Sequence, residues 1–178
     1  AAEKIGQGAE RFAMHVGGQE IAMHSPLVYP GLALIYQFDP TPGRHTQGLL
    51  WDGLYNEEWE KGLGISLRSE AKFDYAGKAE TFRRLIAMTH VSNMVGICQS
   101  HYIAYEPNHL PNFMEAIIGW PVTHEELFDT GERVHQLRHV YNLREGINPF
   151  HFKMPDRILG KPPFAEGPVA GITVDVMD

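Results

Sequence analysis

Cys98 has the most distinctive chemistry in this sequence, because it is the single cysteine among 178 residues. It ends the stretch NMVGIC, residues 93 to 98. A thiolate is a ligand for iron–sulfur clusters and soft metals, whereas an inert thiol acts as a small apolar core residue. Taken alone, the residue type favours the core interpretation. A role as a ligand requires partners elsewhere, because nothing near this stretch resembles a metal-binding motif.

His45 is the second candidate, in the loop PTPGRH of residues 40 to 45. Proline and glycine restrict this backbone, so a side chain there can be directed into a cleft. An imidazole is also the side chain best suited to proton transfer near neutral pH. An ordinary surface histidine is the alternative.

The remaining histidines form no compact ligand set, although the sequence has ten histidines. His135 and His139 are four residues apart, so their side chains could meet on one helix. A partly exposed helix face explains that spacing equally simply, and spacing alone does not establish a ligand pair. Four other histidines are expected at helix ends or on the surface: His90, His101, His109 and His124. The glycines of GLGIS, residues 62 to 66, lack the spacing of a nucleotide-binding loop, and no GxSxG nucleophile motif occurs.

The elements that must position these residues are mostly helices. Serine caps, prolines, glycines and apolar periodicity predict helices over 2–13, 25–38, 76–91, 94–105, 111–119 and 124–142. Thr123 and Glu126 form a capping box for the last of these, with Leu127, Val134, Leu137 and Tyr141 along one side. Gly17-Gly18 predicts a short β-hairpin within residues 12 to 24. We therefore expect a mainly α fold with one hairpin and an extended Pro/Gly-rich C-terminal arm after Gly146.

The composition fits one domain with a real core, since 43% of residues are hydrophobic. The net charge of −7 argues against nucleic acid and anionic membrane as partners. No apolar run approaches the roughly 20 residues that span a bilayer. Without disulfides or a secretory leader, a cytoplasmic location fits best.

Four segments in order resemble the C-terminal part of the tungsten-containing aldehyde:ferredoxin oxidoreductase family. They are HVGGQEIAMHSP, GLALIYQFDPTPGRHTQG, NMVGICQSHY and GERVHQLRHVYNLREGI followed by MPDR. The resemblance implies an enzyme that oxidises aldehydes to carboxylic acids and passes two electrons to ferredoxin. It also implies tungsten, or molybdenum, held by two pterins, with one [4Fe–4S] cluster nearby.

The resemblance assigns site residues one by one. The family motif Asp-x-x-Gly-Leu-Cys matches Asn93, Gly96, Ile97 and Cys98, which makes Cys98 the fourth thiolate ligand of the cluster. Asn93 replaces an acid at the pterin edge and so cannot supply its negative charge. His45 matches a histidine near the tungsten that is suited to move a proton, and Arg44 is a cofactor-binding candidate that is suited to steer a carboxylate product.

The resemblance also implies that the chain is incomplete as an enzyme, because one thiolate cannot hold a four-iron cluster. We expect residues 1–24 to be the tail of a preceding domain and residues 25–178 to be the C-terminal helical domain. Its partners are then the remaining N-terminal domains, ferredoxin and an aldehyde, and the isolated chain should lack both cofactors and activity. The alternative is a non-catalytic helical binding or assembly module that retains the fold without the cofactor; Asn93 favours it slightly.

Overall fold

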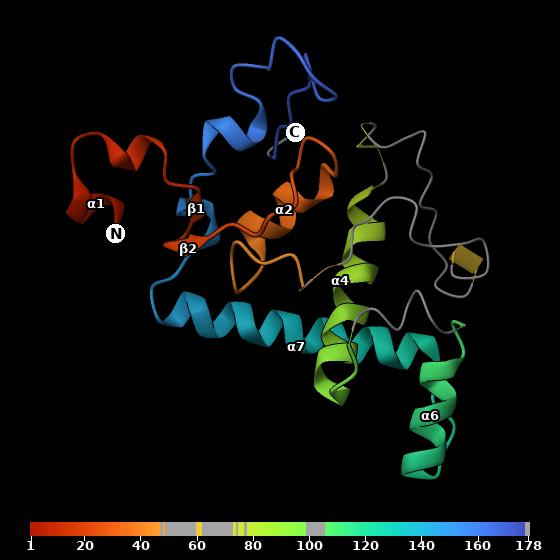
Figure 1. The fold of residues 1–178 in the computed structure, drawn as a ribbon. Helices are drawn as coiled ribbons and strands as arrows, with labels where there is room; N and C mark the ends of the chain where they lie inside the picture. Colours follow the sequence, from red (N-terminus) through yellow and green to blue (C-terminus); the bar gives the residue numbers. More distant parts are fainter. Residues whose placement is uncertain are drawn as a thin grey trace. The chain divides into compact units, whose positions relative to one another are not determined.

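The computed structural model describes residues 1–46, 48, 60–61, 73, 75–76, 78–98 and 106–176 (Figure 1). Within them it confirms a mainly helical chain with a small antiparallel sheet. The elements are α1 (Ala2–Ile5), η1 (Ala9–Arg11), β1 (His15–Val16), β2 (Gln19–Glu20), α2 (Gly31–Phe38), α4 (Lys78–Val95), α6 (His109–Ile118), α7 (His124–Arg144), η3 (Pro149–His151) and η4 (Asp156–Leu159). The chain divides into two compact units, residues 1–45 with 148–178 and residues 46–147. No helix among the described residues is both long and apolar enough to cross a bilayer.

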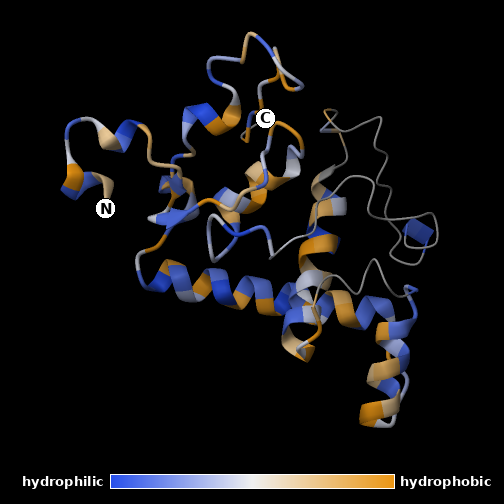
Figure 2. Ribbon diagram, in the orientation of Figure 1, coloured by the Kyte–Doolittle hydropathy of each residue, from blue (hydrophilic) through white to orange (hydrophobic). Residues whose placement is uncertain are grey.

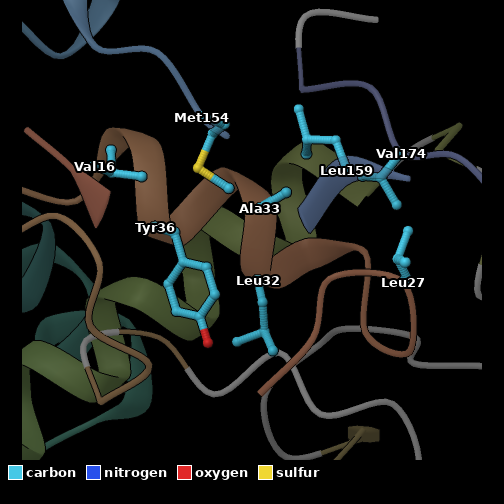
Figure 3. Packing of buried hydrophobic residues seen from close by; sticks show 8 residues of the cluster. All are labelled: Val16, Leu27, Leu32, Ala33, Tyr36, Met154, Leu159 and Val174. Atoms are coloured by element: carbon cyan, nitrogen blue, oxygen red, sulfur yellow. The ribbon is translucent and has the colours of Figure 1, made fainter. Parts of the chain in front are cut away.

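The core of the first unit is built around α2, which is apolar on nearly all sides and therefore buried. Figure 3 shows residues from the N-terminal hairpin, α2 and the C-terminal segment meeting there. The buried set is Val16, Leu27, Leu32, Ala33, Tyr36, Met154, Leu159 and Val174.

The C-terminal segment, which the sequence predicts as an extended arm, also contributes to the core. Met154, Leu159 and Val174 are at most 7% exposed. The N–H of Val174 donates to the carbonyl of Leu159 at 3.0 Å, and Gly160 between them allows a close approach, since a Cβ there would lie 2.3 Å from the carbonyl oxygen of Ile172. The arm is extended, but it supplies part of the hydrophobic core.

The predicted hairpin is confirmed, and the helix predicted before it is wrong over most of its length. His15 pairs with Glu20 and Val16 with Gln19 across a two-glycine turn. The helix expected over 2–13 stops at Ile5, because Gly6 and Gly8 have φ of +63° and +80° and break it. The helix expected from residue 25 begins only at Gly31, because residues 25–30 form turns before it.

The second unit is centred on the crossing of α4 and α7 (Figure 1). Gly131 of α7 lies against the backbone of Ala87 in α4, so closely that a Cβ would sit 2.0 Å from the Ala87 carbonyl oxygen. Large apolar side chains are buried around this contact: Leu85, Met88, Val91, Leu127 and Phe128. The glycine in α7 therefore sets how closely the two helices approach.

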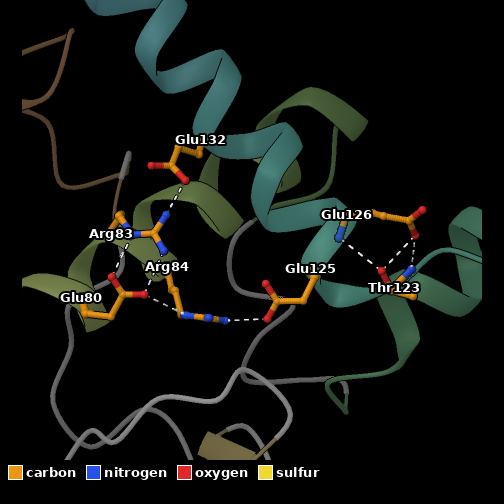
Figure 4. A network of polar contacts seen from close by, with 7 residues as sticks. All are labelled: Glu80, Arg83, Arg84, Thr123, Glu125, Glu126 and Glu132. Atoms are coloured by element: carbon orange, nitrogen blue, oxygen red, sulfur yellow. Dashed lines mark hydrogen bonds and ion pairs between the residues drawn. The ribbon is translucent and has the colours of Figure 1, made fainter.

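Charged side chains join the two helices at the surface (Figure 4). Arg83 of α4 pairs with Glu132 of α7, and Arg84 Nη1 lies 2.9 Å from Glu125 Oε1. Glu80 bridges both arginines on the α4 side. Exposed ion pairs contribute about 0–1 kcal/mol each, so they orient the crossing more than they stabilise it.

The boundaries of these helices partly match the prediction. α4 continues to Val95, and Gly96 ends it at φ +76°, so residues 96–98 do not belong to the helix predicted over 94–105. Residues 99–105 of that prediction lie outside the described residues. α6 begins two residues earlier than predicted and ends at Ile118, where Gly119 follows with φ +83°.

The N-terminal capping box of α7 is confirmed. Thr123 Oγ1 accepts a hydrogen bond from the Glu126 N–H at 3.2 Å, and Glu126 Oε2 accepts one from the Thr123 N–H at 2.8 Å. The residues predicted to line one side of α7 differ in burial, since Leu127 is buried whereas Leu137 and Tyr141 are 67% and 56% exposed. Figure 2 shows apolar positions continuing along α7 to its C-terminal end. The buried residues of α7 all lie in its first half.

Candidate functional site

The loop that carries His45 is fixed by hydrogen bonds on both sides. The Gly43 N–H donates to the carbonyl of Tyr36 in α2 at 2.9 Å, and the Gly43 carbonyl accepts from the Ala22 N–H at 3.0 Å. At the start of the loop, the Thr41 N–H donates to Asp39 Oδ1 at 2.7 Å. The loop is thus held between α2 and the strand segment that follows β2.

Gly43 is required at the centre of this arrangement. Its φ is +76°, and a Cβ there would lie 2.8 Å from the carbonyl oxygen of Glu20. Only glycine allows the backbone to combine that conformation with that close approach. The sequence prediction that glycine and proline fix this loop is consistent with these contacts.

His45 follows two residues later and lies beside a second histidine, His24. The ring centroids are 4.7 Å apart, and the rings meet edge to face at 65°. His45 is half-buried, whereas Arg44 next to it is exposed. Burial, and secondly the charge of His24, lower the pKa of His45 below the ordinary value of histidine. A neutral imidazole is therefore favoured at neutral pH, which suits a proton acceptor.

His24 was not identified from the sequence. It stands 21 residues before His45, and only the folded hairpin and loop bring the two side chains together. Its own backbone is anchored, because Tyr36 Oη donates to the His24 carbonyl at 2.9 Å. Burial raises the pKa of Tyr36 to about 12, so the phenol remains a donor.

The second set of predicted site residues, within residues 93–98, lies where α4 ends. The Ile97 N–H donates to the Ser92 carbonyl at 3.0 Å and closes the turn. Asn93 and Cys98 are exposed and Ile97 is half-buried, so the interpretation of Cys98 as a buried core thiol is wrong. Gly96 takes a positive φ, and among the described residues no atom lies within 4 Å of the position its Cβ would occupy. The exposed position of Cys98 would allow its thiol to reach a ligand.

Across the described part of the chain, no three His, Cys, Asp or Glu side chains are grouped closely enough to hold a metal ion. Cys98 and Asn93 belong to one compact unit and His45 to the other. That these residues serve neighbouring cofactors, as the family resemblance implies, stays a prediction.

The α4–α7 crossing contains a histidine cluster that the sequence only partly indicated. His135 Nε2 and His139 Nε2 are 3.1 Å apart, so one ring donates to the other. The ring of His90 meets that of His135 at a centroid distance of 4.9 Å. His90 is 2% exposed, so its expected place at the surface is wrong. His124 begins α7 and His109 begins α6, as expected, while His101 lies outside the described residues.

The contacts of His90 fix its protonation state. Its Nδ1 lies 2.8 Å from the Ile86 carbonyl, so Nδ1 carries the proton, and its Nε2 lies 2.6 Å from Arg138 Nη1, so Nε2 accepts. A second proton on Nε2 would face the guanidinium. Burial first, and neighbouring charges second, lower the pKa of His135 to about 3. Burial likewise lowers the pKa values of His90 and His139, so the cluster is neutral and structural at neutral pH.

Comparison with known proteins adds a family match over the whole chain. The family model described as aldehyde ferredoxin oxidoreductase, domains 2 & 3, matches residues 1–178. The tungsten-containing aldehyde ferredoxin oxidoreductase of Pyrococcus furiosus is 28% identical over 182 residues, which cover 97% of this chain. The aligned region is 29% of that relative, so the chain spans under a third of its length.

Proposed function

The chain belongs to the aldehyde ferredoxin oxidoreductase family, and we propose that it forms part of an enzyme that oxidises aldehydes to carboxylic acids with ferredoxin as the electron acceptor. The observation that carries the proposal is the exposure of Cys98, which lies two residues after the glycine that ends α4. A structural cysteine would be buried among apolar side chains.

We propose that the chain works together with further domains, which correspond to the part of its relative that lies outside the aligned region. The family description names two domains, which supports more than one domain in this chain; that residues 1–24 are the tail of one and residues 25–178 the other stays a prediction. One thiolate is a quarter of the ligands of a [4Fe–4S] cluster, so three must come from outside this chain. By the same argument the 178 residues alone should be inactive.

The residues at the end of α4 suit the cofactors that the family name implies. Cys98 would hold one iron of the cluster, and the Gly96 turn leaves room for a pterin to approach the backbone. Asn93 and Ile97 would contact the pterin. The tungsten or molybdenum pterin would take up the two electrons from the substrate and the cluster would pass them on.

Asn93 changes the electrostatics of this contact relative to the family motif. A carboxylate would accept strong, charge-assisted hydrogen bonds from pterin N–H groups. The amide accepts with its oxygen and donates with its nitrogen, and it carries no charge. We expect weaker retention of the pterin than with aspartate at this position.

His45 would handle the proton. Oxidation of an aldehyde to a carboxylic acid consumes one water and releases two protons with the two electrons, and these protons must leave the site. The lowered pKa of His45 keeps its ring neutral and able to accept such a proton. Arg44, exposed beside it, would orient a carboxylate by a charge-assisted hydrogen bond.

The test uses the full-length protein, purified without oxygen, with metal analysis and an aldehyde-dependent assay of ferredoxin reduction. We expect tungsten or molybdenum with about four irons per chain, and loss of the iron and of ferredoxin reduction in Cys98→Ala. Met94→Ala, an exposed position in the last turn of α4, is the matched control and should keep both. A metal-free protein, or full iron in Cys98→Ala, would refute the proposal and favour a non-catalytic helical module.

A further inference from the structure

We propose that His24 is a positioning residue for His45, holding its imidazole in one orientation so that one ring nitrogen stays available to accept a proton. This inference rests on the proposed role of His45. It assigns a function to a residue that lies far from His45 in the sequence and contacts its ring directly. His24 acts through His45 and need not touch the substrate.

The geometry of the two rings restricts His45. At a centroid distance of 4.7 Å and an angle of 65°, the edge of one ring points toward the face of the other. Aromatic pairs prefer this arrangement to face-to-face stacking. Rotation of the His45 side chain would lose the contact, so one orientation is favoured over the others that an isolated loop histidine would sample.

Both histidines are anchored to the same buried residue. Tyr36 is fully buried in the core of the first unit. Its side-chain Oη donates to the carbonyl of His24, while its main-chain carbonyl accepts from Gly43, two residues before His45. The ring contact is therefore supported on each side by a hydrogen bond to one rigid helix, which is what a precisely placed pair requires.

The pair also favours the neutral form of His45. Two adjacent imidazoles resist carrying two positive charges, and burial opposes even the first. Burial and His24 both lower the pKa of His45. The other titratable groups on the segments packed around the pair, among the described residues, are Glu20 of β2, Tyr36 of α2, Asp39 and Arg44. His24 is the neighbouring charge that lowers the pKa of His45, and a substitution of His24 can test its contribution.

The test measures His45 directly in the full-length protein. Exchange of the ring C2 hydrogen with deuterium, followed by peptide mass spectrometry over a range of pH, gives a titration midpoint for each histidine. The variants are His24→Ala, which removes the ring, and His24→Phe, which keeps an aromatic ring without nitrogens. His151→Ala, an exposed position in the same unit, is the matched control.

We expect the His45 midpoint in His24→Ala to rise toward the ordinary value of histidine, with a smaller rise in His24→Phe because burial is retained. In the enzyme with its cofactors, the acidic limb of the dependence of kcat on pH should also move to higher pH in His24→Ala. In that variant kcat should fall on the order of tenfold. His24→Phe should recover most of that loss.

The outcomes separate the two proposals. An unchanged His45 midpoint in both variants would overturn the role of His24, whatever the activity. A shifted His45 midpoint together with an unchanged dependence of kcat on pH would support the effect of His24 on His45 but refute the proposed catalytic role of His45. A fall in activity that His24→Phe does not recover, with no shift of the midpoint, would show a merely structural role and would also overturn the inference.

Discussion

Acidification should weaken the α4–α7 unit through the buried histidine cluster, and His135 allows the size of this effect to be worked out. The unfolded ring titrates at 6.5, whereas the folded ring has a pKa of about 3. Between these values the unfolded chain binds a proton that the folded chain refuses. The free energy of unfolding is therefore fully retained above about pH 6.5 and falls as the pH drops toward 3.

The expected loss from His135 alone is substantial. At about pH 5 the unfolded ring is almost entirely protonated and the folded ring almost entirely neutral, so integration from about pH 7.5 gives about 2 kcal/mol. The ring is half-buried, and solvent screening reduces this to about 1–2 kcal/mol. His90 and His139 change the stability in the same direction, since their pKa values are also lowered.

The assay is urea denaturation of wild type and His135→Gln at both pH values, followed by tryptophan fluorescence. All three tryptophans lie between residues 46 and 147, so this signal reports the unit that contains α4 and α7. His135→Gln also loses its contact with His139, so the quantity compared is each variant's change in stability between the two pH values.

His135→Gln should lose about 1–2 kcal/mol less than wild type on acidification. The control His151→Gln, at an exposed histidine, should lose as much as wild type. Equal losses in wild type and His135→Gln would refute the reasoning, because they would mean that the folded state takes up a proton at His135 as readily as the unfolded chain.

Two further predictions test the packing of the two units. Gly131→Ala should lower the free energy of unfolding of the α4–α7 unit by about 2 kcal/mol or more, because its Cβ would lie 2.0 Å from the Ala87 carbonyl oxygen. Urea denaturation measures this loss. The control Arg133→Ala, at an exposed position of α7, should change the stability little. Met154→Ala should lower the free energy of unfolding by about 2–5 kcal/mol, because it leaves a cavity in the first unit. The control Met23→Ala, at a side chain that is 91% exposed, should lower it by almost nothing. Equal unfolding midpoints of the two variants, followed by circular dichroism, would contradict the burial of the C-terminal segment.

Local signals in the sequence predicted the local features of the fold. The capping box of α7 involves atoms three residues apart, and the hairpin turn depends on two adjacent glycines, so each can be recognised within a short window. The break after Ile5 was missed because its two glycines stand in a segment with otherwise helical spacing.

Burial was harder to predict because it depends on what packs against an element. Leu137 and Tyr141 share one side of α7 with the buried Leu127, yet they are exposed, so their spacing alone did not reveal their burial. The meeting of His90 with His135, and of His24 with His45, depends on contacts 45 and 21 residues apart in the sequence. Neither pair leaves a local pattern.

The two predicted site residues share one structural device that connects fold to function. His45 and Cys98 each follow, by two residues, a glycine with φ of +76° that comes after a helix of the core, namely Gly43 and Gly96. Gly96 ends α4 directly, whereas Gly43 lies in the loop five residues after the end of α2 at Phe38.

The surroundings of the two glycines differ in a way that fits their proposed partners. A side chain at Gly43 would collide with the backbone of Glu20, so that glycine serves contacts within this chain. Among the described residues, a side chain at Gly96 would meet no atom within 4 Å, so its cost there would be backbone strain alone, about 1–2 kcal/mol. Close packing inside the chain therefore explains Gly43, whereas Gly96 is explained by its positive φ at the end of α4, as Gly119 is at the end of α6. A ligand that approaches the backbone beside Cys98 would add a second requirement for glycine at position 96, because an added side chain would occupy the space that the cofactor needs.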